Sequence, residues 1–321
     1  MPAISSSERS AAAMTERVTT AHHGLLLTFR RPDELRHHLD VLAAQAEPLD
    51  TLLVVDNDAD PAIRALVEAH EGSAAEVRYL GVHGNPGPAG GIAAGIDTIL
   101  EHAADDDWLV LFDDDDPPQR DDTLPAVRAT VARLVDEGHR VGGVALWGAA
   151  LRRSGRLRVA TGTSPEPVDY LPGGGSAHYS IRALRSVDRH DPDLFFGFDD
   201  LDLGLSLRGG GWSLWSSGLA REHGVGHMVE GRSASATVSA PTWRRYYSQR
   251  NHVLVLRRHG RLLGALTGSL LAGLAKPLLN LPRRPRLALA TLGVSLRALR
   301  DGWLGWSGKS VDPLDPPRWL R

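Results

Sequence analysis

The stretch WLVLFDDDDPP, residues 108–118, indicates the fold more directly than any other part of the sequence. An apolar run from Trp108 to Phe112 leads straight into four aspartates, Asp113 to Asp116, and two prolines follow. A short apolar run of this kind is typical of a strand that is buried on both faces. Adjacent carboxylates repel one another, and a divalent cation held by oxygen ligands would neutralise them. The stretch therefore predicts a buried strand that ends at a cation site, with a solvated turn as the alternative.

Strand-like and helix-like segments alternate through the first part of the chain. The expected strands cover residues 24–29, 51–57, 76–82 and 107–113, and the expected helices cover residues 32–46, 60–72 and 88–103. Buried β runs that alternate with helices predict a parallel sheet with helices on both faces. The ligands of such sheets gather at the carboxyl ends of the strands. The predicted fold class is α/β: a mostly parallel, Rossmann-like sheet flanked by helices, with a helical C-terminal extension.

Composition divides the chain into three regions. Residues 1–22 are rich in Ser and Ala and lack the apolar core of a signal peptide, so they are expected to be a disordered extension. Residues 23–242 form the expected α/β body, whose regular half, 23–120, precedes a glycine-rich half, 121–242, with antiparallel or mixed strands. Residues 243–321 are basic and apolar, and are expected to be helical.

The net charge of −3 conceals an asymmetry between the body and this tail. From Trp243 to Arg321 the chain has 15 Lys and Arg against 3 Asp, which leaves 21 basic and 36 acidic residues in the rest. A basic tail favours an anionic partner such as lipid headgroups, whereas the acidic body argues against nucleic acid. Only 14 uncharged, mostly apolar residues, 262–275, precede Lys276 and Pro277. This run is too short to span a bilayer and predicts a helix in the membrane interface.

The chain has no cysteine, so any bound metal must be held by Asp, Glu or His. Asp56 ends the second expected strand, and Asp199 and Asp200 open a later expected helix. In a parallel sheet these carboxylates and those after Phe112 would meet at one edge, where oxygen ligands select Mg²⁺ or Mn²⁺. Residues 83–91, HGNPGPAGG, lie between a strand and a helix. They suit either a phosphate-binding loop or a tight turn.

Seven motifs in a fixed order carry a family resemblance: LLLTFRRPDEL, LLVVDNDAD, NPGPAGGIAAGI, WLVLFDDDDPP, LPGGGSAHYSIRAL, FFGFDDLDLGLSLRGGGW and REHGVGH. Together they resemble the family 2 glycosyltransferases over roughly residues 24 to 260, and most of all the branch of bacterial rhamnosyl- and galactofuranosyltransferases. The resemblance implies a GT-A fold and an inverting, metal-dependent transfer from a UDP- or dTDP-sugar to a hydroxyl of a glycan or lipid-linked acceptor. Residues 23–242 would then be the catalytic domain, with the nucleotide-sugar half first and the acceptor half second. The ending LRALRDGWLGWSGK is similar to the basic C-terminal segment of membrane-associated members.

The resemblance also implies roles for individual residues. Asp200 is expected to be the general base, with its neighbour Asp199 as the alternative, because Asp199 stands where the family has Glu. Asp115 is the first choice for the metal ligand, with Asp113 and His223 beside it. The expected nucleotide-sugar contacts are Thr28, Arg30, Asp56, Asn85, Gly90, Asp113, Asp114, Gly174 and Gly175. Contacts with the diphosphate or acceptor are expected from Trp147, Tyr247 and Arg250.

Several of these assignments have plain structural alternatives. Trp147 could be a core residue, His223 a structural histidine, and Tyr247 and Arg250 members of an ordinary amphipathic helix. His227 is a weaker metal candidate than His223. Asp116 is an extra carboxylate, so the register of metal binding stays open by one residue.

Two other classes of protein compete with the glycosyltransferase. A sugar nucleotidyltransferase would also combine this sheet with Asp-bound Mg²⁺, but it usually has a glycine-rich loop where this chain has TFRRPDEL. A non-catalytic protein that binds the membrane surface or a polyanion such as nucleic acid would use the basic tail. The expected partners are a nucleotide-diphosphate sugar, a cell-envelope glycan or lipid-linked acceptor, and anionic membrane at the cytoplasmic face of the plasma membrane. No nucleic-acid partner is expected, and no oligomeric state is predicted.

Overall fold

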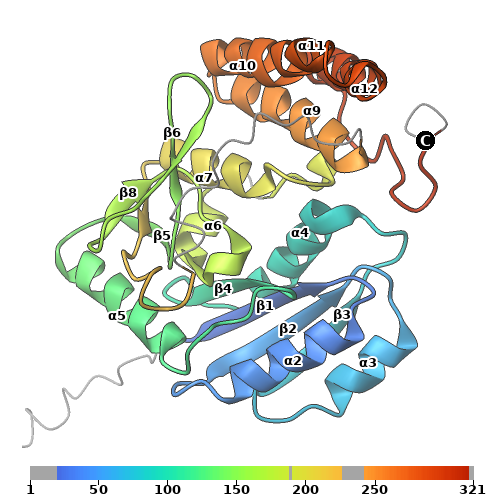
Figure 1. Ribbon diagram of the computed structural model, residues 1–321. Coiled ribbons are helices and arrows are strands. Elements are labelled where there is room, and N and C mark those ends of the chain that lie inside the picture. Colours follow the sequence, from blue (N-terminus) through green and yellow to red (C-terminus); the bar gives the residue numbers. More distant parts are fainter. Residues whose placement is uncertain (1–19, 188–189, 226–241, 318–321) are drawn as a thin grey trace, which may run out of the picture.

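The computed structural model describes residues 20–187, 190–225 and 242–317. Most of the predicted extension, and the segment 226–241 with His227, lie outside these ranges. Within them the chain forms an α/β body with a layer of helices on one side (Figure 1).

Four parallel strands form the first half of the sheet, as the alternation of apolar runs predicted. They are β1 (His22–Thr28), β2 (Leu49–Asp56), β3 (Ala74–Gly81) and β4 (Trp108–Asp113), in the spatial order β3-β2-β1-β4. The residues of β1, β2 and β4 alternate between two largely buried faces, which explains their apolar runs, whereas the edge strand β3 exposes Glu76 and Arg78. The predicted strand ends agree with the structure to within two residues.

Four helices flank these strands: α2 (Pro32–Ala43), α3 (Pro61–Glu68), α4 (Gly87–Leu100) and α5 (Thr123–Asp136). On one face Leu25 of β1 belongs to the same core as Ile96 of α4, and on the other Leu26 packs with Leu39 of α2. A Cβ at Gly95 would lie 2.5 Å from Leu25 Cδ1, so α4 can approach β1 only because this residue is glycine. This close packing fixes the N-terminus of α4 beside the carboxyl ends of the strands.

The second half of the chain extends the sheet with mixed strands, as predicted from its irregular spacing. The added strands are β5 (Val141–Ala145), β8 (Glu166–Val168), β9 (Ala177–Ser180) and β10 (Ser213–Ser216), while β6 (Ala149–Leu151) and β7 (Leu157–Val159) form a separate hairpin. Strand β9 is antiparallel to β4 and β5. The turn before β9, η1 (Gly173–Gly175), is thereby brought to the carboxyl end of β4.

Helix α7 (Asp199–Gly209) begins at the residue where the sequence predicted a helix start. It follows the short elements α6 (Ile181–Arg185) and η2 (Pro192–Leu194). Helix α9 (Trp243–Arg258) connects α7 to the outer layer, because its Arg258 Nη1 donates to Asp202 Oδ2 at 2.7 Å. Figure 1 shows α7 and α9 between the sheet and the outermost helices.

The outer layer consists of α10 (Leu262–Gly268), a π-helical segment η3 (Ser269–Ala275), α11 (Lys276–Asn280) and α12 (Pro285–Leu304). The first three run on without a break, so the prediction of a helix too short to span a bilayer is wrong. The continuous helix Leu262–Asn280 has 19 residues and is long and apolar enough to cross a membrane by length and composition alone. Pro277 does not end it, because this residue lies in the first turn of α11, after π turns that already shift the backbone hydrogen bonding.

Candidate active site

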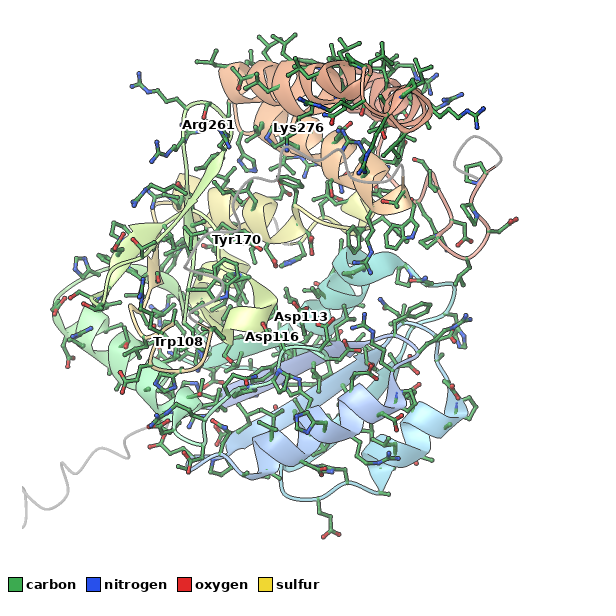
Figure 2. All side chains as sticks on the ribbon, viewed as in Figure 1. Trp108, Asp113, Asp116, Tyr170, Arg261 and Lys276 are labelled. Carbon is green, nitrogen blue, oxygen red and sulfur yellow. The ribbon has the colours of Figure 1, made fainter. Side chains whose placement is uncertain are left out.

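A cavity of about 510 Å³ opens at the carboxyl ends of β1 and β4. The loops after β2 and β3 form one side of it, and the start of α7 and the start of α9 form the other. Figure 2 shows Asp113 and Asp116 at the centre of the molecule, between the sheet and the upper layers, with Tyr170 above them. The predicted residues that line the cavity are Thr28, Asn85, Asp113, Asp114, Asp115, Asp199 and Asp200.

Two of the aspartates after β4 are tied to the loop after β1. Thr28 Oγ1 donates to Asp114 Oδ2 at 2.8 Å. Arg31 Nη1 donates to Asp114 Oδ1 at 2.9 Å and to Asp115 Oδ2 at 2.6 Å. Asp114 is buried, whereas the Asp115 side chain is 58% exposed and only its pairing with Arg31 restrains it. The loop after β1 therefore sets the position of both carboxylates.

Asp113 is the carboxylate with the least favourable surroundings. Burial raises its pKa to about 8, and the charges of Asp200 and Asp115 add to the effect. A Cβ built on Gly173 would lie 3.1 Å from Asp113 Oδ1, and one on Gly174 would collide with the Asp116 carboxylate. Glycines are thus required where the turn before β9 presses against the aspartates.

On the far side of the cavity, Asp199 and Asp200 face a histidine that the sequence analysis did not identify. His190 is buried, and its Nε2 lies 3.8 Å from Asp199 Oδ2 and 3.7 Å from Asp200 Oδ1. Burial, followed by the charge of Asp200, raises the pKa of Asp199 to about 6. Burial alone would lower the pKa of His190, but the two carboxylates outweigh it and the net shift is upward. No motif marked His190 in the sequence, because only the fold places it beside α7.

The donor set suits a hard divalent cation. Asp113 and Asp115 line the cavity with carboxylate oxygens, and Mg²⁺ is commonly held by one or two carboxylates together with substrate phosphates and water. Burial and the neighbouring carboxylates both raise the pKa of Asp113, and a bound cation would favour its ionised form. In the part of the chain that the structure describes, three ligand atoms within 4.8 Å of one another are found at His190, Asp199 and Asp200, not at Asp113 and Asp115. A cation at Asp113 and Asp115 would therefore need ligands from the substrate.

The predicted nucleotide contacts Asp56 and Arg30 do not line the cavity, whereas the residues that follow them, Asn57 and Arg31, do. The Asp56 carboxylate is buried and accepts hydrogen bonds from Asp58 N (2.9 Å), Asp60 N (2.7 Å) and Tyr79 Oη (2.9 Å), while Asn57 lines the cavity. Arg30 has a positive φ of 56° and pairs with Asp58 at 2.6 Å, so that Arg31 takes the cavity position. The roles predicted for Asp56 and Arg30 stay predictions.

Five other predicted residues also lie outside the lining: Gly90, Trp147, Gly174, Gly175 and His223. His223 is buried, with Nδ1 3.0 Å from Thr123 Oγ1. Trp147 is a core residue whose ring lies 6.1 Å from that of Tyr170, and Gly175 packs beside it. Gly90 is buried inside α4. Trp147 thus has the structural position that was its alternative, and the metal role of His223 stays a prediction.

Tyr247 and Arg250 do not line the cavity but hold in place segments that do. Tyr247 Oη donates to Val311 O at 2.7 Å and accepts from Val311 N at 2.9 Å. Arg250 Nη1 donates to Gly308 O at 2.6 Å and its Nη2 to Leu194 O at 3.0 Å. Both side chains are fully buried and fasten the segment after α12 to the body. Pro313 and Leu314 of this segment line the cavity.

The start of α9 contributes lining residues that the sequence analysis assigned only to an amphipathic helix. Trp243 and Arg244 both line the cavity, and the Arg244 guanidinium lies 5.2 Å from the centre of the Trp243 ring. The loop before α7 is held nearby by Asn251, whose Nδ2 donates to Leu194 O at 2.7 Å and to Phe196 O at 2.9 Å. The run WRRYYSQRN is rich in aromatic residues and arginine, but the spacing of these residues does not reveal which side chains face the cavity.

Comparisons with known proteins agree with this geometry. Residues 25–136 match the family model described as Glycosyl transferase family 2. The chain is 44% identical over 94 residues to a protein described as galactofuranosyltransferase GlfT1 from Mycobacterium tuberculosis, a match that covers 29% of this chain and 30% of the relative. A protein of the same description from Mycolicibacterium smegmatis is 36% identical over 115 residues, covering 36% of this chain and 34% of that one. The matches thus span only about a third of each relative's length. The predicted resemblance is confirmed over this part of the chain: residues 25–136 match the family 2 glycosyltransferase model, and a stretch of 94 residues is similar to a galactofuranosyltransferase.

Solved structures show the fold. TarS 1–349 of S. aureus in complex with UDP has a TM-score of 0.51 at 14% identity and covers 89% of this chain and 88% of its own. GalNAc-T7 with UDP, GalNAc and Mn²⁺ has a TM-score of 0.53 at 10% identity, covering 75% of this chain and 48% of that one. The predicted GT-A fold is confirmed.

The two adjacent arginines after β1 provide a matched pair for testing the donor side. Arg31→Ala removes the cation that holds Asp114 and Asp115, so we expect UDP binding in the presence of Mn²⁺ to weaken about 10-fold or more, as is typical when a charge-paired hydrogen bond is lost. Arg30→Ala removes only the pairing with Asp58, and UDP affinity should change less than about 3-fold. Isothermal titration calorimetry with UDP and Mn²⁺ measures the affinity of both variants and shows which arginine supports UDP binding. A larger loss of UDP affinity in Arg30→Ala than in Arg31→Ala would instead support the nucleotide contact that the sequence predicted for Arg30.

The raised pKa of Asp113 predicts a pH dependence of stability. The unfolded chain loses this proton near the ordinary value of 3.8, whereas the folded state keeps it to about pH 8. Because the folded state then holds more protons, the free energy of unfolding should fall as pH rises between these values. Mn²⁺ should restore stability more at pH 8 than at pH 5, since it binds the ionised carboxylate. Urea denaturation across this pH range measures both effects.

Asp113→Asn should flatten this slope and remove most of the Mn²⁺ effect. Asp33→Asn is the matched control, because Asp33 is an exposed carboxylate of α2 outside the cavity. An unchanged slope in Asp113→Asn would show that other groups cause the pH dependence.

Proposed function

We propose that this protein is an inverting, metal-dependent glycosyltransferase that moves a sugar from a nucleotide-diphosphate donor to a hydroxyl of a glycan or lipid-linked acceptor. The observation that carries the proposal is the cavity itself. Its lining brings aspartates from the end of β4 together with Asp199 and Asp200 from the start of α7, on a GT-A fold. The aspartates at the end of β4 suit the donor diphosphate, and those at the start of α7 suit the acceptor hydroxyl.

The donor side is formed by the strand ends. Thr28 and Arg31 hold Asp114 in place, and Asn85 and Gly87 present the turn before α4 to the cavity. Asp113 and Asp115 would hold a Mg²⁺ or Mn²⁺ ion, which when bound supplies positive charge for the departing diphosphate. A UDP- or dTDP-sugar is the donor we favour, because the galactofuranosyltransferase relatives and the rhamnosyltransferase branch point to such sugars.

Asp200 is the residue we assign as general base. Its side chain lines the cavity and is 20% exposed, whereas Asp199 beside it is more deeply buried. Asp200 would take the proton of the acceptor hydroxyl as that oxygen attacks the anomeric carbon and the diphosphate leaves from the opposite face, which inverts the configuration. A positioned base of this kind contributes about 10²–10⁴-fold to the rate, and alignment of the two substrates adds to it.

The outer helices favour an acceptor presented at a membrane. Their exposed leucines include Leu262, Leu263, Leu266, Leu270, Leu278, Leu279, Leu289 and Leu296. A soluble protein rarely exposes so many large apolar side chains on neighbouring helices, and the arginines of the tail suit anionic headgroups. Figure 2 shows Arg261 and Lys276 at this end of the molecule, away from Asp113. We propose that this leucine face rests in the cytoplasmic leaflet of the plasma membrane.

A second cavity lies between the leucine face and the donor cavity. Its volume is about 770 Å³, and α9, α10 and α11 form much of its wall. Leu271 and Leu279 give it an apolar side, and Arg244 lines both cavities. This arrangement offers an amphiphilic acceptor a route from the membrane to Asp200, which supports a lipid-linked acceptor over a free sugar.

The variants Asp200→Asn and Asp115→Ala separate base chemistry from donor binding. Asp200→Asn should lower kcat by about 10³-fold or more while UDP–Mn²⁺ affinity stays within about 3-fold, because the amide cannot accept the proton. Asp115→Ala should lose the Mn²⁺ dependence of UDP binding. Thermal-shift screening of UDP-, dTDP- and GDP-sugars with Mn²⁺ selects the donor, and product formation from that donor measures turnover. Full turnover by Asp200→Asn would exclude it as the base.

Membrane contact is tested by substitution and not by deletion, because Tyr247 and Arg250 bond to residues beyond α12 and a truncated chain would lose them. The triple variant Leu263→Ser, Leu270→Ser, Leu279→Ser should reduce cosedimentation with vesicles containing anionic lipid by about 10-fold or more. Val135→Ser with Leu157→Ser is the control, since these exposed apolar residues lie on the body. Equal binding by both variants would contradict the assignment of the leucine face.

A further inference from the structure

We propose that His190 is a positioning residue that holds the Asp200 carboxylate in the orientation needed for proton transfer. This inference rests on the proposed role of Asp200 as general base. His190 is not part of the cavity lining, and its side chain is fully buried behind α7. It would therefore act through Asp200 and not on a substrate.

The unsatisfied atoms of this cluster carry the inference. Neither ring nitrogen of His190 has a hydrogen-bond partner within the described part of the chain, and Asp200 Oδ1 is likewise buried without one. These groups face each other, with His190 Nε2 3.7 Å from Asp200 Oδ1. Leaving a buried polar group unpaired costs about 1–3 kcal/mol, and more for a charged group. Closing this short gap would pair His190 Nε2 with Asp200 Oδ1 and remove this cost for both atoms.

The charges on the surrounding elements leave His190 as the partner for this carboxylate. From α9, Arg258 Nη1 and His259 Nε2 bond to the two oxygens of Asp202, at 2.7 and 2.9 Å. Arg258 Nη2 also bonds to Asp191. Asp199 lies beside Asp200 on α7, Asp113 approaches from β4, and Tyr170 from the segment before η1. All three of these groups are acidic or neutral.

The pairing would leave the rest of the carboxyl group available for catalysis. Asp200 Oδ1 is inaccessible to solvent, although the side chain as a whole is 20% exposed and lines the cavity. A ring nitrogen that binds Oδ1 would restrict rotation of the carboxyl group about its Cβ–Cγ bond. The other oxygen would then face an acceptor hydroxyl in a fixed direction, and a misplacement of about 1 Å can cost about 100-fold in rate.

The test compares His190→Gln with His178→Gln. His178 is the matched control, because it is also fully buried but bonds to Ser176 O at 2.8 Å and packs on His22. We expect His190→Gln to lower kcat by about 10–100-fold with the donor KM within about 3-fold, and to move the acidic limb of the kcat–pH profile to higher pH, because the carboxylate loses a donor that favours its ionised form. His178→Gln should lower the melting temperature without altering that limb.

Three outcomes would overturn the inference. The first is an unchanged kcat and pH profile in His190→Gln; if Asp200→Asn is inactive in the same assay, the base assignment survives and only the positioning role fails. The second is an equal change in His178→Gln. The third is a tightly bound metal ion, detected by elemental analysis, that is lost in His190→Gln but kept in Asp115→Ala, since it would make His190 a ligand. If His190→Gln does not fold, the comparison is repeated in the Asp199→Asn background, which removes one of the two facing carboxylates.

Discussion

The need to compensate buried carboxylates governs this structure more than any other interaction. Most acidic groups at or near the cavity face a basic side chain: Arg31 pairs with Asp114 and Asp115, Arg258 and His259 pair with Asp202, and His190 faces Asp199 and Asp200. Among the described ion pairs none involves Asp113, whose pKa is raised by burial and by the charges of Asp200 and Asp115. In the proposed function, the cation and the donor would bind beside this carboxylate. Helices α7 and α9 are held together by the Arg258–Asp202 pair, so charge compensation also positions the proposed base, Asp200, relative to the strand ends.

The sequence predicts the sheet well because its signals are local. Apolar runs of strand length identify β1 to β4, and the aspartates at their ends fall at one edge because parallel strands all point the same way. The start of α7 is equally local, since acidic residues in a first turn complement the helix dipole. The cavity and its carboxylates follow from these features with no knowledge of long-range contacts.

The remaining site residues depend on features that the pattern of residue types does not contain. Arg30 and Arg31 are chemically identical, and only the positive φ of Arg30 decides which one reaches the aspartates. His190 becomes relevant through its burial against α7, and Tyr247 and Arg250 through partners 56 to 64 residues away. The helix Leu262–Asn280 continues through Pro277 because of π turns that no residue pattern announces. Sequence reasoning thus identifies the chemistry of the edge but not the groups that hold it in place.

The return of the chain from α12 to the donor cavity has a consequence for biosynthesis. The strand ends and α7 are made early, but Pro313 and Leu314 complete the cavity wall only after Val311 and Gly308 have bonded to α9. A ribosome therefore releases the sheet long before it releases a finished binding site. Until residue 314 is made, the proposed sugar-nucleotide site lacks the part of its wall that Pro313 and Leu314 form. The order of synthesis thus keeps the site incomplete until the outer helices have been made.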